Sequence, residues 1–370
     1  MISYRPELDP ALMAPVAERE ELREVVRALL QKYAGTEQVR AAAASPAGYS
    51  EELWRRLNAE LEIGRLAMAE ELGGHGYGMA EVAVVLEECG AALLPEPVLG
   101  SAVLGCQALA AADQPAGVRD LLDAALDGDL IVTVSLGGAD LTAGRRGSDW
   151  VVEGRRERVL HAAAADLVVV DVETAEGPAL FALRADDLTI APRTTIDPTR
   201  RQADVAAVGA PARCVVGPER FARVAARLGV LRDVAVAAEH TGIVGELLDR
   251  TVEYVGQREQ FGRAIGSFQA IKHRLADVLV DRERSRSAAR YAAVAFDAAP
   301  ASAALPAAIA ASVCADAVVR TAHETVQLHG GIGFTWEHFA HDYVRRALGD
   351  EGLFGASRAS RAQIAELVGI

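Results

Sequence analysis

One stretch near the C-terminus combines residue types that suit a phosphate-bearing ligand. Residues 254–278 read YVGQREQFGRAIGSFQAIKHRLADV, with Arg258 three residues before Phe261. A guanidinium binds phosphate oxygens through forked donors, and an aromatic ring gives a purine or ribose a flat surface to pack against. The alternative for the arginine is a surface ion pair with Glu253 or Glu259.

A second stretch, residues 327–347, reads QLHGGIGFTWEHFAHDYVRRA. The side-chain amide of Gln327 can both donate and accept hydrogen bonds. Gly330 and Gly331 carry no Cβ, so a bound ligand can approach their backbone closely. Taken alone, the glycines are also consistent with the end of a helix. The two stretches together, in this order, favour a ligand site.

Histidines near these stretches do not predict a metal site. His273, His323 and His329 have no second histidine or carboxylate at metal-ligand spacing. His338 and His341 are three residues apart and can share a helical face, but no third ligand is evident. We therefore expect surface or interface histidines and no bound metal.

The charge of the chain limits its partners. The 370 residues include 38 Lys and Arg against 52 Asp and Glu, a net charge of −14. Such a surface repels polyanions, so we expect no nucleic-acid partner. The most apolar stretch, residues 301–319, is rich in alanine and is interrupted by Pro306 and Asp316. It favours a helix buried in a bundle, and no membrane span is expected.

Cysteine usage and the N-terminus indicate a cytoplasmic protein. The four cysteines form no Cys-x-x-Cys pair and show no zinc spacing: Cys89, Cys106, Cys214 and Cys314. We expect buried, reduced thiols that act as small apolar side chains. Residues 1–10 contain no basic segment followed by an apolar one, so they predict no secretory signal peptide.

The hydrophobic pattern divides the chain into three parts, and the first, residues 1–128, is helical. Apolar residues from Leu22 to Tyr33 recur along one helical face, and a further helix is predicted over residues 80–92. The glycine-rich segment 73–78 has some likeness to a phosphate-binding loop. No β-branched strand precedes it and it lacks Lys-Ser/Thr, which favours a turn.

Residues 129–216 show the pattern of a β-domain. Gly, Asp and Pro separate short runs of strand-forming residues: 131–134, 150–152, 167–172, 180–183, 188–190 and 214–216. This spacing predicts an antiparallel sheet or a small barrel. Helices do not alternate with these runs and Gly-x-Gly-x-x-Gly does not occur, so a doubly wound dinucleotide-binding fold is disfavoured.

Residues 217–370 predict a C-terminal helical bundle. Four long helical segments are joined by short connections: 219–255, 268–298, 302–328 and 337–348. A short terminal helix is expected over residues 358–367. Long helices with short connections are typical of a bundle. The fold class is therefore α+β, with an N-terminal helical domain, a middle β-barrel domain and a C-terminal four-helix bundle.

The two C-terminal stretches and the helical, β, helical order resemble the acyl-CoA dehydrogenase family of flavoproteins. The resemblance covers essentially the whole length, strongly at the C-terminus and weakly in the β-domain. It implies dimers of dimers, with FAD lying across the interface of two subunits. Arg258 matches the arginine of the family's RxxFG motif, and an FQ pair follows ten residues later. The implied FAD-binding residues are Arg258, Phe261, Phe268, Gln269, Gln327, Gly330 and Gly331.

The resemblance also implies a reaction, the α,β-dehydrogenation of an acyl-CoA thioester. In the family a glutamate removes the α-proton while the β-hydrogen leaves as hydride to the flavin, so a carboxylate must face the substrate. Here Phe354 stands at the glutamate position of the YEGT-like stretch. In another branch of the family the base lies about 26 residues before the RxxFG arginine, where this chain has Arg232. Neither position offers a carboxylate.

Glu239 is the alternative base. It follows Arg232 by seven residues, on nearly the same helical face but roughly 10 Å further along the axis. That offset prevents a simple exchange of bases unless the acyl chain enters differently. A carboxylate packed at a helix contact, or solvated, is the simpler interpretation. Asp350 and Glu351 lie close to Phe354 in sequence but about a turn out of register.

The β-domain motif of the family is altered as well. Relatives read TEPxAGSD and contribute backbone and hydroxyl contacts to the flavin ring. This chain has TVSLGGAD at Thr133–Asp140 and keeps only the threonine, the second glycine and the aspartate. The tryptophan of a GEKTWI-like strand is replaced by Arg158. A guanidinium differs from an indole in both charge and shape.

A two-chain enzyme accounts for the retained and the lost motifs. Some family members form heterotetramers with one FAD per heterodimer, in which one chain holds the flavin ring and the base. The other chain gives its RxxFG and QxxGG contacts, and this chain is similar to that second kind. We expect an α2β2 assembly with a homologous subunit, an acyl-CoA substrate and an electron acceptor. Such pairs are associated with bulky substrates, steroid side-chain CoA thioesters among them.

Two alternatives remain open. The first is a homo-oligomeric acyl-CoA dehydrogenase that uses Glu239 as its base. The second is a scaffold subunit that keeps the fold and has lost the flavin altogether.

Overall fold

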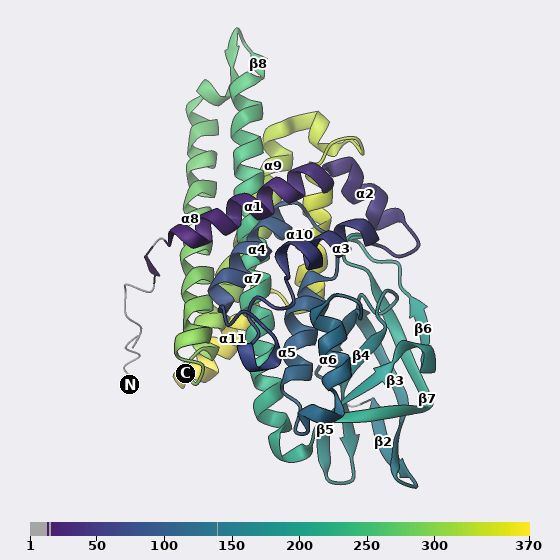
Figure 1. The fold of residues 1–370 in the computed structure, drawn as a ribbon. Helices are drawn as coiled ribbons and strands as arrows, with labels where there is room; N and C mark the ends of the chain where they lie inside the picture. Colours follow the sequence, from purple (N-terminus) through teal and green to yellow (C-terminus); the bar gives the residue numbers. More distant parts are fainter. Residues whose placement is uncertain (1–12, 15, 139) are drawn as a thin grey trace. The chain divides into compact units, whose positions relative to one another are not determined.

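The computed structural model describes residues 13, 14, 16–138 and 140–370 (Figure 1). Residues 1–10, from which the absence of a signal peptide is predicted, and Ala139 of the altered β-domain motif lie outside the described residues. The chain divides into two compact units. The first takes in the described residues up to Val39 together with Met79–Leu94 and Asp233–Ile370. The second comprises Arg40–Gly78 and Pro95–Arg232. The three-domain limits predicted from sequence stay predictions.

The first unit is built from long helices. Its elements are α1 (Ala17–Tyr33), α4 (Met79–Ala91), α7 (Pro218–Gln257, which begins in the second unit), α8 (Gln269–Ala298), α9 (Ala304–His329), α10 (Ala340–Phe354) and α11 (Ser357–Val368). The helices α7 and α8 run side by side, and a hairpin of β8 (Glu259–Gln260) and β9 (Arg263–Ala264) joins them at one end (Figure 1). These helices agree with the predicted segments to within a few residues. The largest difference is that α10 continues past Leu348, through Gly349 and Gly352, and ends at Phe354, before Gly355 with φ 96°.

The helix α9 is the apolar core helix that the sequence predicts. It packs against α8, α10 and α11, and its alanine-rich face is buried. By length and composition alone, residues 304–334 are also apolar enough to cross a membrane, and half of the most apolar window is buried inside the structure. A core helix satisfies the same criteria, because burial in protein and burial in lipid both select apolar side chains.

Two glycines allow α4 and α7 to touch backbone to backbone. A Cβ on Gly242 of α7 would lie 1.7 Å from the carbonyl oxygen of Glu87. A Cβ on Gly90 of α4 would lie 2.1 Å from the carbonyl oxygen of Glu239. Both distances are far below van der Waals contact, so neither position has room for a side chain. This crossing fixes Glu239 within the packed interior of the first unit.

The second unit combines short helices with a β-domain. Its elements are α2 (Thr36–Ala44, which begins in the first unit), α3 (Glu51–Leu61), a π-helical turn (Val98–Gly105), α5 (Cys106–Ala110), α6 (Arg119–Leu126), β1 (Val132–Ser135), β2 (Leu141–Arg146), β3 (Asp149–Leu160), β4 (Leu167–Thr174), β5 (Gly177–Arg184), β6 (Thr189–Pro192) and β7 (Gln202–Val216). Strands β4, β2, β3, β7 and β5 pair in that order, and β5 pairs back onto β4. The sheet therefore closes on itself, as a barrel does.

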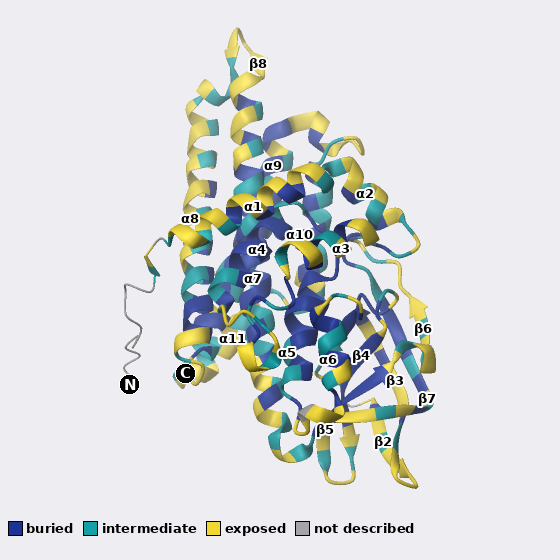
Figure 2. Cartoon of the chain, viewed as in Figure 1, coloured by how far each residue is buried: buried dark blue, intermediate teal, exposed yellow. Residues whose placement is uncertain are grey.

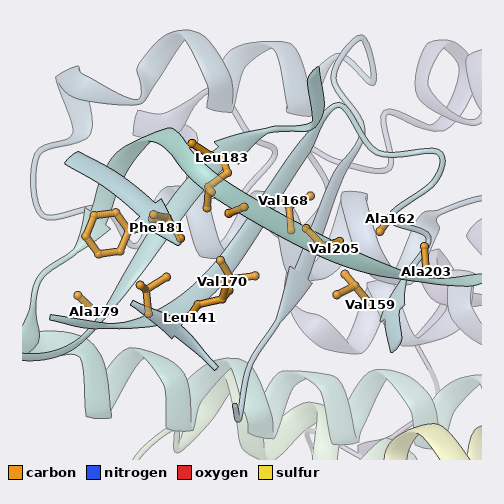
Figure 3. Packing of buried hydrophobic residues seen from close by; sticks show 14 residues of the cluster. Leu141, Val159, Ala162, Val168, Val170, Ala179, Phe181, Leu183, Ala203 and Val205 are labelled. Carbon is orange, nitrogen blue, oxygen red and sulfur yellow. The ribbon is translucent and has the colours of Figure 1, made fainter. Parts of the chain in front are cut away.

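The barrel interior is filled by apolar side chains from every part of that ring. Val168 and Val170 of β4, Phe181 of β5 and Val205 of β7 are all buried in one cluster (Figure 3). The predicted small barrel is confirmed. Most neighbouring strands pair antiparallel, but β1 and β2 both pair parallel to β4. Neither of these two pairs is joined by a hairpin, because a hairpin joins only antiparallel strands.

The thiols follow the prediction at three of four positions. Cys89, Cys106 and Cys314 are buried and free, and burial raises the pKa of Cys106 and of Cys314 to about 12. These thiols are therefore unreactive near neutral pH. The prediction is wrong for Cys214, which is exposed. Cys214 lies near the end of β7 and directly precedes the buried residues Val215 and Val216.

We expect Gly242→Ala to destabilise the chain by about 3 kcal/mol or more, because α4 and α7 must separate to admit the new methyl group. Gly229→Ala on the same helix is the matched control, since a Cβ there meets no atom within 4 Å. This control should be neutral or stabilising by up to about 1 kcal/mol. Urea unfolding of both variants measures the difference, and equal midpoints would contradict the backbone contact.

Candidate functional site

Arg258 and Phe261 lie on the exposed hairpin that joins α7 to α8 (Figure 2). Phe261 adopts a φ of 54° and is 91% exposed. Among the described residues the guanidinium of Arg258 has no hydrogen-bond or ion-pair partner, so the alternative ion pair with Glu253 or Glu259 is not observed. The backbone of Arg258 is held at both ends, because its N–H donates to Tyr254 O (2.8 Å) and its carbonyl accepts from Ile265 N (2.8 Å). The backbone of Arg258 is therefore held in place, while its guanidinium has no partner among the described residues.

The FQ pair lies at the other side of the same hairpin. Phe268 immediately precedes α8, and its ring meets the ring of Phe261 edge-on at 6.1 Å between centroids. The guanidinium of Arg263 stacks over Phe268 at 3.9 Å from the ring centroid. Gln269 is exposed and shares a 3.0 Å hydrogen bond with the Nε2 atom of His273. The structure therefore brings the four residues of the first motif into one exposed hairpin.

Gln327, Gly330 and Gly331 lie where α9 ends. Gln327 is exposed on the last turn, and Gly330 follows the helix with φ 63° and ψ −142°, a conformation that favours glycine. A Cβ on Gly330 or Gly331 would meet no atom within 4 Å, so their backbone faces open space. The glycines end the helix and also leave the backbone accessible.

One buried aromatic contact joins the two motifs. His329, the last residue of α9, is 3% exposed and stacks on Tyr254 of α7 at 4.3 Å between ring centroids, with 24° between the planes. The hydroxyl of Tyr254 donates to the carbonyl oxygen of His329 (3.3 Å). Tyr254 lies one turn before Arg258, and His329 directly precedes Gly330. The contact therefore sets the two exposed segments beside each other at one end of the first unit.

The loop at Thr133–Asp140 in the second unit is closed by its own neighbours. The carboxylate of Asp171 accepts hydrogen bonds from the backbone N–H groups of Gly137 (3.1 Å) and Gly138 (3.3 Å). The buried guanidinium of Arg156 pairs with Asp171 (2.7 Å) and donates to Gly138 O (2.9 Å). The hydroxyl of Thr133 is fully buried and donates to Leu160 O. The N–H groups of Gly137 and Gly138 and the hydroxyl of Thr133 therefore already have partners within the chain.

Arg158, which replaces the family's tryptophan, is part of β3. It lies exposed at an irregularity of β3 with φ 54°, and its N–H donates to Asp204 (3.1 Å). The buried cation of this strand is Arg156, two residues earlier. The bulge between Arg156 and Val159 shifts the strand register, and such a shift exchanges inward and outward side chains.

Phe354 occupies one of the positions at which the family holds its base, and three carboxylates, Asp233, Asp350 and Glu351, line the same pocket. Phe354 is the last residue of α10 and lines a small pocket in the first unit, together with Asp233, Val236 and His240 of α7. His240 shares a 3.1 Å hydrogen bond with the buried carboxylate of Asp350. Glu239 is 5% exposed and is not among the described residues that line this pocket.

The remaining histidines serve as packing groups. His338 lies 4.6 Å from the ring of His329, and His341 meets Trp336 edge-on at 5.0 Å. Within the described ranges, no three His, Cys, Asp or Glu side chains come together as a candidate metal site.

Comparison with known proteins identifies the fold and its family. Residues 220–369 match the acyl-CoA dehydrogenase C-terminal domain, and residues 16–126 match the acyl-CoA dehydrogenase N-terminal domain. The chain belongs to the acyl-CoA dehydrogenase family. It is 37% identical to the acyl-CoA dehydrogenase IpdE2 of Mycobacterium tuberculosis, over 94% of this chain and 96% of that protein. It is 34% identical to the acyl-CoA dehydrogenase FadE27 of the same organism, over 85% and 87%.

Solved structures of acyl-CoA dehydrogenase complexes share the fold. The crystal structure of the ChsE4–ChsE5 complex from Mycobacterium tuberculosis matches with a TM-score of 0.88 and 30% identity, over 98% of this chain and 99% of that chain. A variant of the Tcur3481–Tcur3483 steroid acyl-CoA dehydrogenase matches with a TM-score of 0.86 and 28% identity, over 95% and 98%. Each description names two components.

Sequence reasoning missed Arg156 and Asp171, although a signal was present. Asp171 interrupts the apolar run Leu167–Val172, and a carboxylate in a buried strand requires a cation or several donors. It also missed two exposed apolar side chains near the acyl-CoA dehydrogenase glycine motif, Phe334 (80% exposed) and Trp336 (73% exposed). Helical periodicity does not reveal such residues, because they lie in a connection between α9 and α10.

Replacing Arg156 with Ala should destabilise the chain by about 3–5 kcal/mol, because Asp171 is then left buried without its cation. Arg155→Ala is the matched control, since Arg155 is exposed and Asp204 keeps its second partner Arg193. Arg155→Ala should lower the free energy of unfolding by about 1 kcal/mol or less. Chemical unfolding measures both variants. Similar losses for the two arginines would contradict the assignment of a buried, closed loop.

His329 predicts a loss of stability at acidic pH. Burial lowers the pKa of His329 below its ordinary value, partly opposed by the hydrogen bond to Thr325 O. Above about pH 6.5 the ring is neutral in the folded and unfolded chain, whereas at lower pH the unfolded chain binds the proton first. The wild-type chain should therefore lose more stability between pH 7.5 and 5.5 than His329→Phe. Identical losses in both proteins would show that His329 does not titrate as described.

Proposed function

We propose that this chain is the auxiliary subunit of a cytoplasmic, two-chain acyl-CoA dehydrogenase. It contributes contacts to the nucleotide end of FAD across an α2β2 interface, while a homologous partner holds the flavin ring and supplies the general base. The reaction is the α,β-dehydrogenation of an acyl-CoA thioester, with electrons passing to an acceptor. The observation that carries the proposal is an asymmetry: the nucleotide-contact residues are exposed and open, whereas the ring-contact loop is closed.

The residues for the nucleotide end fit a bound pyrophosphate and adenosine. Arg258 offers a guanidinium that has no partner among the described residues, and Phe261 offers an exposed ring beside it. The accessible backbone of Gly330 and Gly331 lies at the same end of the first unit, since Tyr254 and His329 join the two segments. A charge-assisted contact to phosphate and a face for the adenosine are what this end of FAD requires.

The loop for the flavin ring does not fit. In acyl-CoA dehydrogenases that hold the ring, the corresponding stretch supplies backbone N–H groups and a hydroxyl. Here Asp171 takes the N–H groups of Gly137 and Gly138, and Leu160 takes the hydroxyl of Thr133. Arg156 fills the space beside Gly138, where an added Cβ would already lie 2.8 Å from its guanidinium. We therefore assign the ring contacts to the partner chain.

The general base is assigned to the partner for a related reason. Phenylalanine has no group that can accept a proton, and Phe354 lines the pocket at the base position. Glu239 packs at the close crossing of α4 and α7 and does not line that pocket. The alternative of a homo-oligomer that uses Glu239 would need both a reoriented carboxylate and an opened ring loop.

The relatives support a bulky acyl group and a second chain. The Tcur3481–Tcur3483 structure is described as a steroid acyl-CoA dehydrogenase, and ChsE4 and ChsE5 form a complex. By analogy we propose a steroid side-chain acyl-CoA or a substrate of similar bulk. An enzyme with one flavin site per pair of chains can leave more room around that site.

The test is to count FAD in the purified chain, alone and after co-expression with a homologous acyl-CoA dehydrogenase chain. We expect a colourless chain alone and about one FAD for each pair of chains in the complex. Arg258→Ala should weaken FAD binding by the complex about tenfold or more, because a charge-assisted contact to the pyrophosphate is lost. Arg358→Ala on α11, an exposed arginine without a described partner, is the control and should leave binding unchanged.

Each alternative has its own result. A yellow chain that oxidises an acyl-CoA by itself would establish the homo-oligomeric enzyme. A complex that contains the chain but binds FAD equally well with Arg258→Ala would establish the scaffold.

A further inference from the structure

The contact between the half-buried Tyr254 and the buried His329 connects both exposed segments of the nucleotide end. Neither residue belongs to the set that the motifs predict. The His329 ring is 3% exposed and lies between Tyr254 and a second pair of rings, His338 (4.6 Å between centroids) and Phe339 (5.5 Å). The ring is therefore held on two sides.

Hydrogen bonds fix the orientation of His329 as well as its place. The Nδ1 atom lies 2.7 Å from the carbonyl oxygen of Thr325, and because a carbonyl only accepts, Nδ1 carries the proton. The side-chain oxygen of Thr325 accepts a 3.3 Å hydrogen bond from the hydroxyl of Thr251, which lies one turn before Tyr254 on α7. The helices α7 and α9 are thus tied at two successive turns next to the site.

The Tyr254 hydroxyl acts on the glycine segment directly. It donates to the carbonyl oxygen of His329, which belongs to the peptide bond that joins His329 to Gly330. The N–H of Gly330 is bound from the other side by the carbonyls of the last α9 turn, those of Val326 and Gln327. This peptide is held at both ends, although Gly330 itself is free to adopt many conformations. The direction of the following backbone depends on those bonds.

The same tyrosine supports the arginine segment. The carbonyl oxygen of Tyr254 accepts the N–H of Arg258, and the carbonyl of Arg258 accepts the N–H of Ile265, which closes the hairpin. Outside these bonds the hairpin is exposed and has few neighbours (Figure 2). Tyr254 therefore makes a hydrogen bond to the backbone of each segment: it accepts one from the N–H of Arg258 and donates one to the carbonyl oxygen before Gly330.

We propose that Tyr254 and His329 are positioning residues that set the distance between the Arg258 guanidinium and the Gly330–Gly331 backbone, so that both reach one nucleotide. This inference rests on the proposed function for its ligand, but the coupling between the segments is a property of the chain alone. Preorganising two contacts in this way lowers the entropy cost of binding a ligand that spans them.

The first experiment is hydrogen–deuterium exchange on the purified chain. His329→Ala should speed exchange in residues 258–265 roughly threefold to tenfold, the range expected when one aromatic contact is lost. That segment is far from His329 in sequence. His329→Phe keeps an aromatic ring and should restore slow exchange. Tyr254→Phe keeps the stack but removes the hydroxyl, so faster exchange should be confined to the segment around Gly330 and Gly331.

Unchanged exchange in residues 258–265 for a folded His329→Ala chain would overturn the proposal. If His329→Ala does not fold, Tyr254→Phe decides, since it deletes a single oxygen. Slow exchange around Gly330 in that variant would then be the contradicting result.

The second experiment measures FAD binding by the two-chain complex. His329→Ala should weaken binding roughly threefold to tenfold, whereas the double variant with Arg258→Ala should bind no more weakly than Arg258→Ala alone. A general structural defect would give additive losses instead and would overturn the positioning role. If Arg258→Ala leaves FAD binding unchanged, the proposed function fails, and the exchange experiment still decides the coupling of the segments.

Discussion

Asp171 is a carboxylate within an apolar strand, and its burial requires a cation and hydrogen-bond donors close by. The chain supplies both: the guanidinium of Arg156 on β3, and the N–H groups of Gly137 and Gly138 in the loop after β1. Groups that already have partners within the chain are not available to a cofactor. The ion pair is therefore the interaction on which the proposed division of the flavin site between two chains depends.

Two of the residues proposed for the nucleotide end differ from this closed loop in that they are exposed and their side chains have no hydrogen-bond or ion-pair partner among the described residues. Arg258 and Phe261 remain on a solvent-exposed hairpin, where a cation without a partner costs little. An exposed ring and an unpaired guanidinium contribute nothing to the stability of the isolated chain. Their arrangement has a purpose only when another molecule covers them, and the two exposed side chains Phe334 and Trp336 near the glycine motif are consistent with a covered surface.

The sequence predicts the elements well and the closed loop poorly. Helical periodicity and short connections place α7, α8 and α9 within a few residues, because burial of an apolar stripe imposes that pattern. Arg258 and Gly330 belong to two local motifs, so the sequence alone, through its resemblance to the family, brings them out as candidates. The pairing of Arg156 with Asp171 joins two strands, and β3 changes register between Arg156 and Val159, so no local pattern reveals which arginine is buried. Likewise, the Tyr254–His329 stack joins two helices, so no local pattern reveals it.

The most direct test of the account is a structure of the two-chain complex with FAD bound, in which the distances from each chain to the two ends of the cofactor are measured. The account predicts the Arg258 guanidinium within hydrogen-bonding distance of the pyrophosphate, the flavin ring against the partner's barrel, and the Arg156–Asp171 pair intact. A flavin ring seated against Thr133 of this chain, with Glu239 facing the substrate, would contradict it.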